Sequence, residues 1–236
     1  MAPHDFDIDG LATYLHLTPA QVARMASRGT LPGRKVGGQW RFSEAEIHHW
    51  LEERIGASDD DDDLAHMENL LQNGSAKETE IRIRELLPVE AIAVPLNART
   101  RQSVITHMVE LAAETGWLWD PERMAEAIRA RESLQSTALD SGVALLHPRR
   151  PQSGILERPF LALGRTAGGI PFGAARGGLT DLFFLLCSVD DKQHLRTLAR
   201  LCRLIGDAEL LTAIREAPDA AAVHQAIAQY EQVHFE

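Results

Sequence analysis

The sequence of 236 residues has little cysteine, no long apolar run and no excess of positive charge. Its two cysteines, Cys187 and Cys202, stand inside apolar patterns, so we expect buried packing groups rather than a disulfide or a metal pair. No apolar run is long enough to cross a bilayer, and no signal peptide is recognisable. These absences predict a cytoplasmic protein without membrane insertion.

Acidic residues outnumber basic residues overall, but one segment carries only basic charge. The net charge of −10 argues against a uniformly basic, nucleic-acid-binding surface. Between Pro19 and Phe42, however, acidic residues are absent and five cations occur, namely Arg24, Arg28, Arg34, Lys35 and Arg41. By contrast, Asp59–Asp63 is an unbroken run of aspartates, which we expect to be solvated, although it could also occupy the basic segment in cis. Residues 19–42 are therefore a candidate surface for binding a polyanion.

The first 55 residues are typical of two short helices followed by a hairpin and a third helix. Ile8–Leu15 and Pro19–Arg28 have helical spacing, and Thr18 is placed to cap the second helix, which Gly29 ends. A Gly-Gly pair at 37–38 between alternating apolar and polar residues predicts a hairpin. A third helix follows over Glu44–Arg54. This order predicts a helix-turn-helix with a small wing.

The same segment resembles the excisionase/MerR-like winged helix-turn-helix family. The resemblance rests on the Gly29–Pro32 turn, the Val36–Gly38 hairpin and the Trp40–Phe42 strand. It implies that the second helix enters the major groove of duplex DNA while the wing touches the backbone or minor groove. It assigns DNA contacts to Gln21, Arg24 and Arg28 on the helix and to Arg34, Lys35 and Arg41 on the wing. A solvated basic face or a protein-binding module is the alternative.

From Ile81 onward, apolar strand-like runs alternate with helical segments, which predicts an α/β domain with a covered sheet. Strands are expected near residues 92–94, 143–146, 160–163 and 182–189, and helices near 101–115, 121–130, 191–204, 208–216 and 220–231. Glycines at 168–173 predict a turn. We therefore divide the chain into a DNA-binding domain over 1–56, an acidic linker over 57–80 with one short helix at 64–73, and an α/β domain over 81–236.

One histidine in this α/β domain is placed for chemistry. Val143–Leu146 reads as a buried strand, and Pro148 ends it because proline has no amide to donate. His147 therefore stands at the strand end, where an imidazole can act as a nucleophile and carry a phosphoryl group. Nearby groups that could bind the phosphoryl oxygens are Arg131, Thr137, Arg149 and Arg150. A histidine that merely ends a strand is the structural alternative.

The stretch from Arg131 to Arg150 resembles the active-site segment of bacterial phosphotransferase-system enzyme IIA domains of the fructose/mannitol/nitrogen-regulatory class. The positions in register are Arg131-Glu132, Ser136-Thr137, Gly142, Ala144 and His147. The resemblance implies that His147 accepts a phosphoryl group from a histidine-containing phosphocarrier protein, supported by Arg131, Thr137 and a second histidine, His194. It implies neither a cofactor nor a metal. Asp140 departs from the family's glycine-rich loop and is expected to place a negative charge near the phosphoryl group.

These observations predict an α/β chain with a small N-terminal winged helix-turn-helix and a larger enzyme IIA-like domain, whose mixed sheet is flanked by helices. The leading hypothesis is a transcription regulator that binds DNA and carries a phosphohistidine signal, as in nitrogen regulation. Two alternatives remain: a degenerate enzyme IIA-like interaction domain without phosphoryl transfer, and a phosphotransferase component that serves sugar transport. The DNA site, the signal, the direction of regulation and a homo-oligomeric state are left open.

Overall fold

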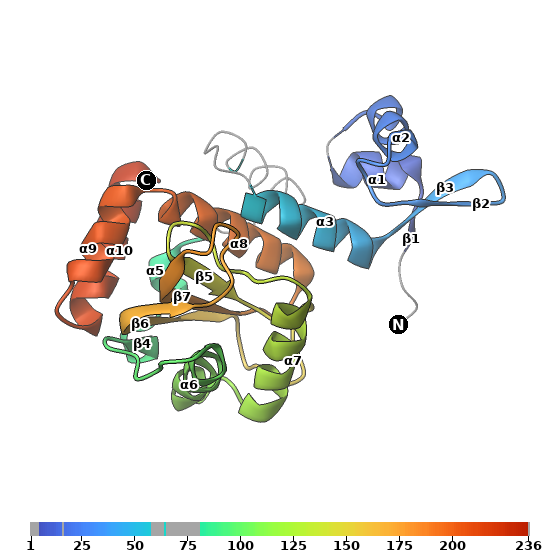
Figure 1. Ribbon diagram of the computed structural model, residues 1–236. Helices are drawn as coiled ribbons and strands as arrows, with labels where there is room; N and C mark the ends of the chain where they lie inside the picture. The colour runs from blue at the N-terminus through green and yellow to red at the C-terminus, as the bar shows by residue number, and fades with distance from the viewer. Residues whose placement is uncertain (1–4, 16, 58–63, 65–80, 236) are drawn as a thin grey trace. The chain divides into compact units, whose positions relative to one another are not determined.

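The chain divides into two compact units, Met1–Thr79 and Glu80–Glu236 (Figure 1). The computed structural model describes residues 5–15, 17–57, 64 and 81–235. The aspartate run at 59–63 and, apart from Leu64, the predicted helix at 64–73 lie outside the described residues. Within the described ranges, no helix combines the length and the apolar character that a membrane span requires.

The first unit is a helix-turn-helix with a three-stranded antiparallel sheet of order β1-β3-β2. Its elements are β1 (Asp5–Phe6), α1 (Ile8–Tyr14), α2 (Pro19–Ser27), β2 (Arg34–Val36), β3 (Gln39–Ser43) and α3 (Glu44–Ala57). Gly37 and Gly38 have φ of 59° and 82°, the left-handed conformation that the tight β2–β3 turn requires. The hairpin and the two helices predicted from the sequence are thus present.

The two short helices of this unit begin at side-chain caps. Asp7 accepts a hydrogen bond from the amide of Gly10 at 2.8 Å, and Thr18 forms a reciprocal capping box with Gln21. A helix of seven or nine residues is marginal on its own, so burial of its apolar face must hold it in place. Leu11 and Val22 supply that face, since both side chains are fully buried.

The second unit is an α/β domain built around a four-stranded sheet of order β4-β6-β7-β5. Its elements are α5 (Ile83–Leu86), a short 3-10 helix η1 (Val89–Ala91), β4 (Ile92–Ala93), α6 (Arg101–Glu114), α7 (Pro121–Leu134), β5 (Val143–Leu146), β6 (Phe160–Pro171), β7 (Leu179–Cys187), α8 (Asp191–Ile205), α9 (Ala208–Glu216) and α10 (Ala220–His234). β5 runs parallel to β7 and β4 parallel to β6, whereas β6 and β7 are antiparallel. The sheet is therefore mixed, which confirms the predicted fold class.

Alternating side chains of the strands build a core on each face of this sheet. Phe183 and Leu185 of β7 belong to a cluster that includes apolar side chains of α6 and α7. In Figure 1, α8 lies across the sheet from α6, and its Leu195, Leu198 and Leu201 are buried. A strand covered on both faces is continuously apolar, which explains why the segment from Leu182 to Cys187 has no polar alternation.

The predicted turn over residues 168–173 is wrong. β6 continues to Pro171, and its pairing with β7 shifts register between Arg165 and Ile170. A Cβ on Gly169 would lie 2.6 Å from the Cβ of Leu179, so this glycine permits close approach of the two strands rather than a chain reversal. The chain reverses only after β6, in the segment that leads to β7 at Leu179.

Candidate functional site

Two histidines of the second unit come together at one edge of its sheet. Because β5 and β7 are parallel neighbours, their carboxyl ends meet at the same edge. His147 directly follows β5, and His194 lies in the first turn of α8, which begins four residues after β7 ends. The predicted strand-end position of His147 and the helix-start position of His194 thus place both side chains at this edge.

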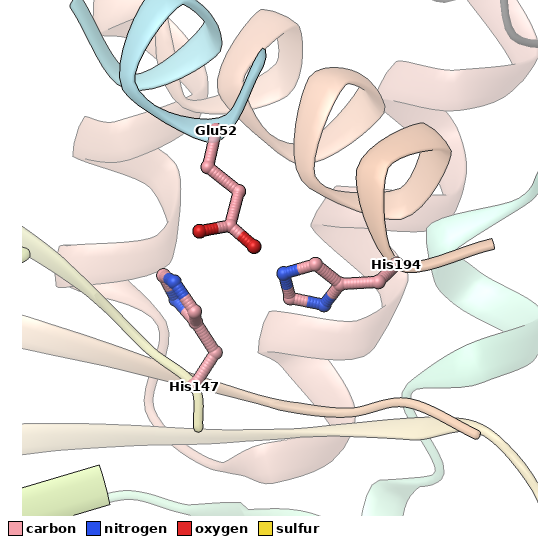
Figure 2. Close-up of side chains that lie close together, drawn as sticks. All are labelled: Glu52, His147 and His194. Carbon is pink, nitrogen blue, oxygen red and sulfur yellow. The ribbon is translucent and has the colours of Figure 1, made fainter. Parts of the chain in front are cut away.

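The two imidazole rings are close and each is held by a hydrogen bond. Their centroids are 5.1 Å apart with 53° between the ring planes (Figure 2). Nδ1 of His147 lies 2.7 Å from the carbonyl oxygen of Leu145, and Nδ1 of His194 lies 3.0 Å from the hydroxyl oxygen of Ser188. These bonds fix the orientation of both rings.

The bond from His147 also decides its tautomer. A carbonyl oxygen can only accept, so Nδ1 of His147 carries a proton and donates it to Leu145. In the neutral imidazole, the nucleophilic lone pair then lies on Nε2. Nε2 of His147 is therefore the nitrogen able to attack an electrophile such as phosphorus.

A buried carboxylate organises the segment that precedes β5. Glu132, near the end of α7, accepts hydrogen bonds from the backbone amide of Thr137 at 3.1 Å and from the Thr137 hydroxyl. Its other oxygen accepts from the guanidinium of Arg101 at 2.8 Å, and that guanidinium lies 5.3 Å from the ring centroid of Phe172. The hydroxyl of Thr137, expected to bind phosphate, thus donates to Glu132 instead.

Arg131, near the end of α7, is a buried cation with 8% of its surface exposed. Its terminal nitrogen donates to the backbone carbonyl of Gln135 at 2.7 Å. Its Nε is buried without a hydrogen-bond partner in the part of the chain that the structure describes. The Nε–H of Arg131 can therefore still donate a hydrogen bond to a bound anion.

The charged residues on either side of β5 have different surroundings. Arg149 and Arg150, which follow His147, are exposed. Asp140, in the preceding loop, pairs with the side chain of Arg176 at 3.2 Å and accepts from its amide at 3.1 Å. The negative charge expected to act on a phosphoryl group is therefore compensated by Arg176.

In the first unit, the three residues predicted to contact DNA from α2 and its C-cap share an exposed face. Gln21, Arg24 and Arg28 are spaced i, i+3 and i+7, which places them on one side of the helix and its C-terminal cap. All three are exposed, while Val22 and Ala26 on the opposite side are buried. The geometry leaves this face accessible to a ligand of the first unit.

The three wing cations make contacts within the first unit. Arg34 forms an ion pair with Asp5 at 2.8 Å, and the ammonium of Lys35 lies 5.2 Å from the ring centroid of Trp40. Arg41 is half-buried and donates to the carbonyl of Trp40 at 3.4 Å. Asp5 therefore offsets part of the positive charge that the sequence assigns to the wing.

Sequence reasoning missed Ser188, the contacts of Glu132 with Thr137 and Arg101, and the role of Gln21 in the capping box. Ser188 orients His194, but a serine just before a helix carries no signal of that contact. Glu132 directly follows Arg131, and its proximity to Thr137 depends on how α7 ends. The capping box could have been predicted from the sequence, because Thr18 is followed by a glutamine three residues later.

Both thiols are inert packing groups. Burial raises the pKa of the Cys187 thiol far above its usual range and raises the pKa of Cys202 to about 12. A thiol becomes nucleophilic only as a thiolate, so neither cysteine is reactive at neutral pH in the folded chain.

Comparison with known proteins matches each of the two units to a protein family. Residues 85–230, more than half of the chain, match the family described as "Phosphoenolpyruvate-dependent sugar phosphotransferase system, EIIA 2", and residues 6–55 match a helix-turn-helix domain family. The second unit is similar to a nitrogen regulatory protein of Bradyrhizobium diazoefficiens, 32% identical over 149 residues, covering 62% of this chain and 94% of that protein.

Two further relatives extend this comparison. A fructose-specific EIIABC component of Bacillus subtilis is 28% identical over 154 residues, which cover 64% of this chain but only 24% of that longer protein. The crystal structure of nitrogen regulatory protein IIA-Ntr from Neisseria meningitidis superposes with a TM-score of 0.56 at 24% identity, covering 61% of this chain and 98% of that one. The chain therefore belongs to the phosphotransferase-system EIIA 2 family and carries a helix-turn-helix domain ahead of its EIIA unit.

Proposed function

We propose that the second unit accepts a phosphoryl group on Nε2 of His147 from a histidine-containing phosphocarrier protein. The observation that carries this proposal is the hydrogen bond from Nδ1 of His147 to the carbonyl of Leu145, which directs the lone pair to Nε2. Membership of the EIIA 2 family and the neighbouring ring of His194 support it.

In the proposed reaction, the lone pair on Nε2 of His147 forms a bond to phosphorus while the phosphorus–nitrogen bond of the donor breaks. The electron pair of that bond returns to the donor imidazole. When Ser188 donates to Nδ1 of His194, the proton of His194 resides on Nε2, where it can donate to a phosphoryl oxygen. The guanidinium of Arg131 would stabilise the negative charge of the same phosphoryl group.

The test is phosphorylation of the full chain by phosphoenolpyruvate, the first enzyme of a phosphotransferase cascade and a phosphocarrier. His147→Ala should accept no acid-labile phosphoryl group, and His194→Ala should accept it more slowly by a factor on the order of 100, as for loss of one donor to the transition state. His107→Ala, on α6, is the matched control and should behave as the wild type. Full labelling of His147→Ala would contradict the assignment.

We further propose that the first unit binds duplex DNA through α2. The exposed Gln21, Arg24 and Arg28 support this, as does the match to a helix-turn-helix family. In such domains the second helix enters the major groove. Duplex binding by the full chain should weaken steeply as salt rises, because cationic side chains that contact phosphates release counterions.

Fluorescence anisotropy with a labelled duplex tests the DNA proposal. The double variant Arg24→Ala/Arg28→Ala should lose about 1–3 kcal/mol of binding free energy for each base contact that it removes. Arg54→Ala is the control, because Arg54 is an exposed cation of the same unit that stands on α3, against the ring of Trp50. Equal losses in both variants would contradict a DNA-binding face on α2.

Together these proposals describe a regulator whose DNA binding responds to phosphorylation, in the manner of nitrogen regulation. Phosphorylation adds negative charge and acceptor oxygens, which change a protein's state only if they interact differently with two conformations. Duplex affinity should therefore differ between the phosphorylated wild type and His147→Ala after both have been incubated with the same phosphotransferase cascade.

Two other outcomes would favour the alternative functions. A wild type that no phosphocarrier labels would favour an interaction domain. Onward transfer to a sugar permease, without a change in DNA affinity, would favour a transport component.

A further inference from the structure

The side-chain amide of Gln21 has a fixed orientation at the start of α2. Both the backbone amide and the hydroxyl of Thr18 donate to Oε1 of Gln21, each at 2.8 Å, and the hydroxyl accepts from the Gln21 amide at 3.3 Å. A backbone N–H can only donate, so the atom facing it must be the side-chain oxygen. The capping box therefore holds Oε1 against Thr18 and turns the amino group, Nε2, away from Thr18.

This orientation changes what Gln21 can recognise. An unconstrained glutamine reads adenine with two bonds, because its oxygen accepts from N6 while its amino group donates to N7. With its oxygen engaged by Thr18, Gln21 offers only donors. Guanine presents two acceptors in the major groove, N7 and O6, so it is the purine that suits a donor-only side chain.

The position of Gln21 suits contact with a base. It is the third residue of α2, and the N-terminal residues of the second helix in helix-turn-helix domains contact base edges. Its side chain is exposed on the same face as Arg24 and Arg28. We propose that Gln21, held by Thr18, is a specificity-determining residue that selects guanine over adenine at one position of the DNA site. This inference rests on the proposed binding of DNA by α2.

Two substitutions separate the donor role from the cap. Gln21→Glu retains the capping box, since glutamate is also a regular partner of threonine at this position, but it replaces the amino group with an acceptor. Gln21→Lys loses the side-chain acceptor of the capping box, while the bond from the backbone amide of residue 21 to the Thr18 hydroxyl can remain, and it is still a donor. The Glu variant should therefore change the preferred base from guanine to cytosine, whose N4 donates, while the Lys variant should keep guanine.

The experiment selects binding sites for the full chain from a randomised duplex pool and repeats the selection with each variant. Wild type should show a guanine preference over adenine of about tenfold at one position, the size expected for a discriminating base contact. Gln39→Glu is the charge control, because this exposed residue stands on β3. It should weaken binding to all sequences equally and leave the preferred base unchanged.

Distinct results would overturn the inference and the function on which it rests. Retention of guanine by Gln21→Glu would show that Gln21 does not read this base. A wild-type preference for adenine that disappears in Gln21→Glu would show that the oxygen leaves the cap to read DNA. Failure of the wild type to bind any duplex would overturn the DNA-binding proposal, and this inference with it.

Discussion

Replacing Glu132 with alanine should destabilise the second unit, because its buried carboxylate connects the end of α7 to the segment before β5. The backbone amide and hydroxyl of Thr137 would lose their acceptor, and Arg101 would lose its ion-pair partner. These groups differ in exposure, so they contribute unequally to the expected loss.

The magnitude follows from that difference. Arg101 has 39% of its side-chain surface exposed, so water replaces much of the lost ion pair, which contributes no more than about 1 kcal/mol. Thr137 is 7% exposed, and each buried donor left without an acceptor costs about 1–3 kcal/mol. We expect a total loss of about 3–4 kcal/mol of unfolding free energy, since the hydroxyl can rotate toward another acceptor.

Urea denaturation followed by tryptophan fluorescence measures this loss. The chain has four tryptophans, so Trp40→Phe and Trp50→Phe together leave Trp117 and Trp119, both in the second unit, as reporters. The control is Glu126→Ala, an exposed position of the same helix, which should change stability by less than about 0.5 kcal/mol.

A second variant separates the two contacts of this carboxylate. Glu132→Gln can keep an oxygen toward Thr137 but turns an amino group toward Arg101, so it should lose about 1 kcal/mol. A loss below 1 kcal/mol in Glu132→Ala would refute the reasoning. A loss of the same size in Glu126→Ala would refute it equally.

Further predictions concern buried groups and one glycine of the second unit. Burial raises the pKa of Glu231 above 4.5, so protonated Glu231 contributes stability at low pH that is lost as pH rises. Urea titrations should therefore show the wild type losing stability relative to Glu231→Gln as pH increases from about 4.5. Cys187 and Cys202 should resist a thiol-specific disulfide reagent in the native chain and react in urea, which absorbance would follow. Gly173→Ala should lose about 1–3 kcal/mol in thermal unfolding, because φ is 112° and the added Cβ would meet a side-chain atom 2.9 Å away, whereas Gly154→Ala has open space and should be neutral.

Local patterns in the sequence were sufficient for part of the site. The apolar run before His147 and the proline after it predicted a strand end, because strand formation and proline chemistry act over a few residues. The mixed sheet followed from the alternation of strands and helices together with the resemblance to enzyme IIA. Local reasoning therefore located His147 within the fold.

The remaining contacts depend on residues far apart in the sequence. His194 approaches His147 because β5 and β7 are parallel neighbours, a pairing that no local pattern specifies. Asp140 pairs with Arg176 only because the β6–β7 connection returns to the preceding loop. The glycines near 168 resembled a turn because a sequence does not show whether glycine serves backbone freedom or close approach of strands.

The second unit begins and ends at the same corner. The carboxylate of Glu231, on its last helix, accepts the amides of Ile83 at 2.7 Å and Arg84 at 2.9 Å, just after the point where the unit starts. His224 of the same helix contacts the carbonyl of Arg84 at 3.0 Å. A domain closed on itself in this way can be joined to other sequences at either terminus without rethreading its sheet. This architecture thus suits a domain that can be fused to different partner domains. The region of the longer Bacillus subtilis protein that matches this unit is accordingly only about a quarter of that protein.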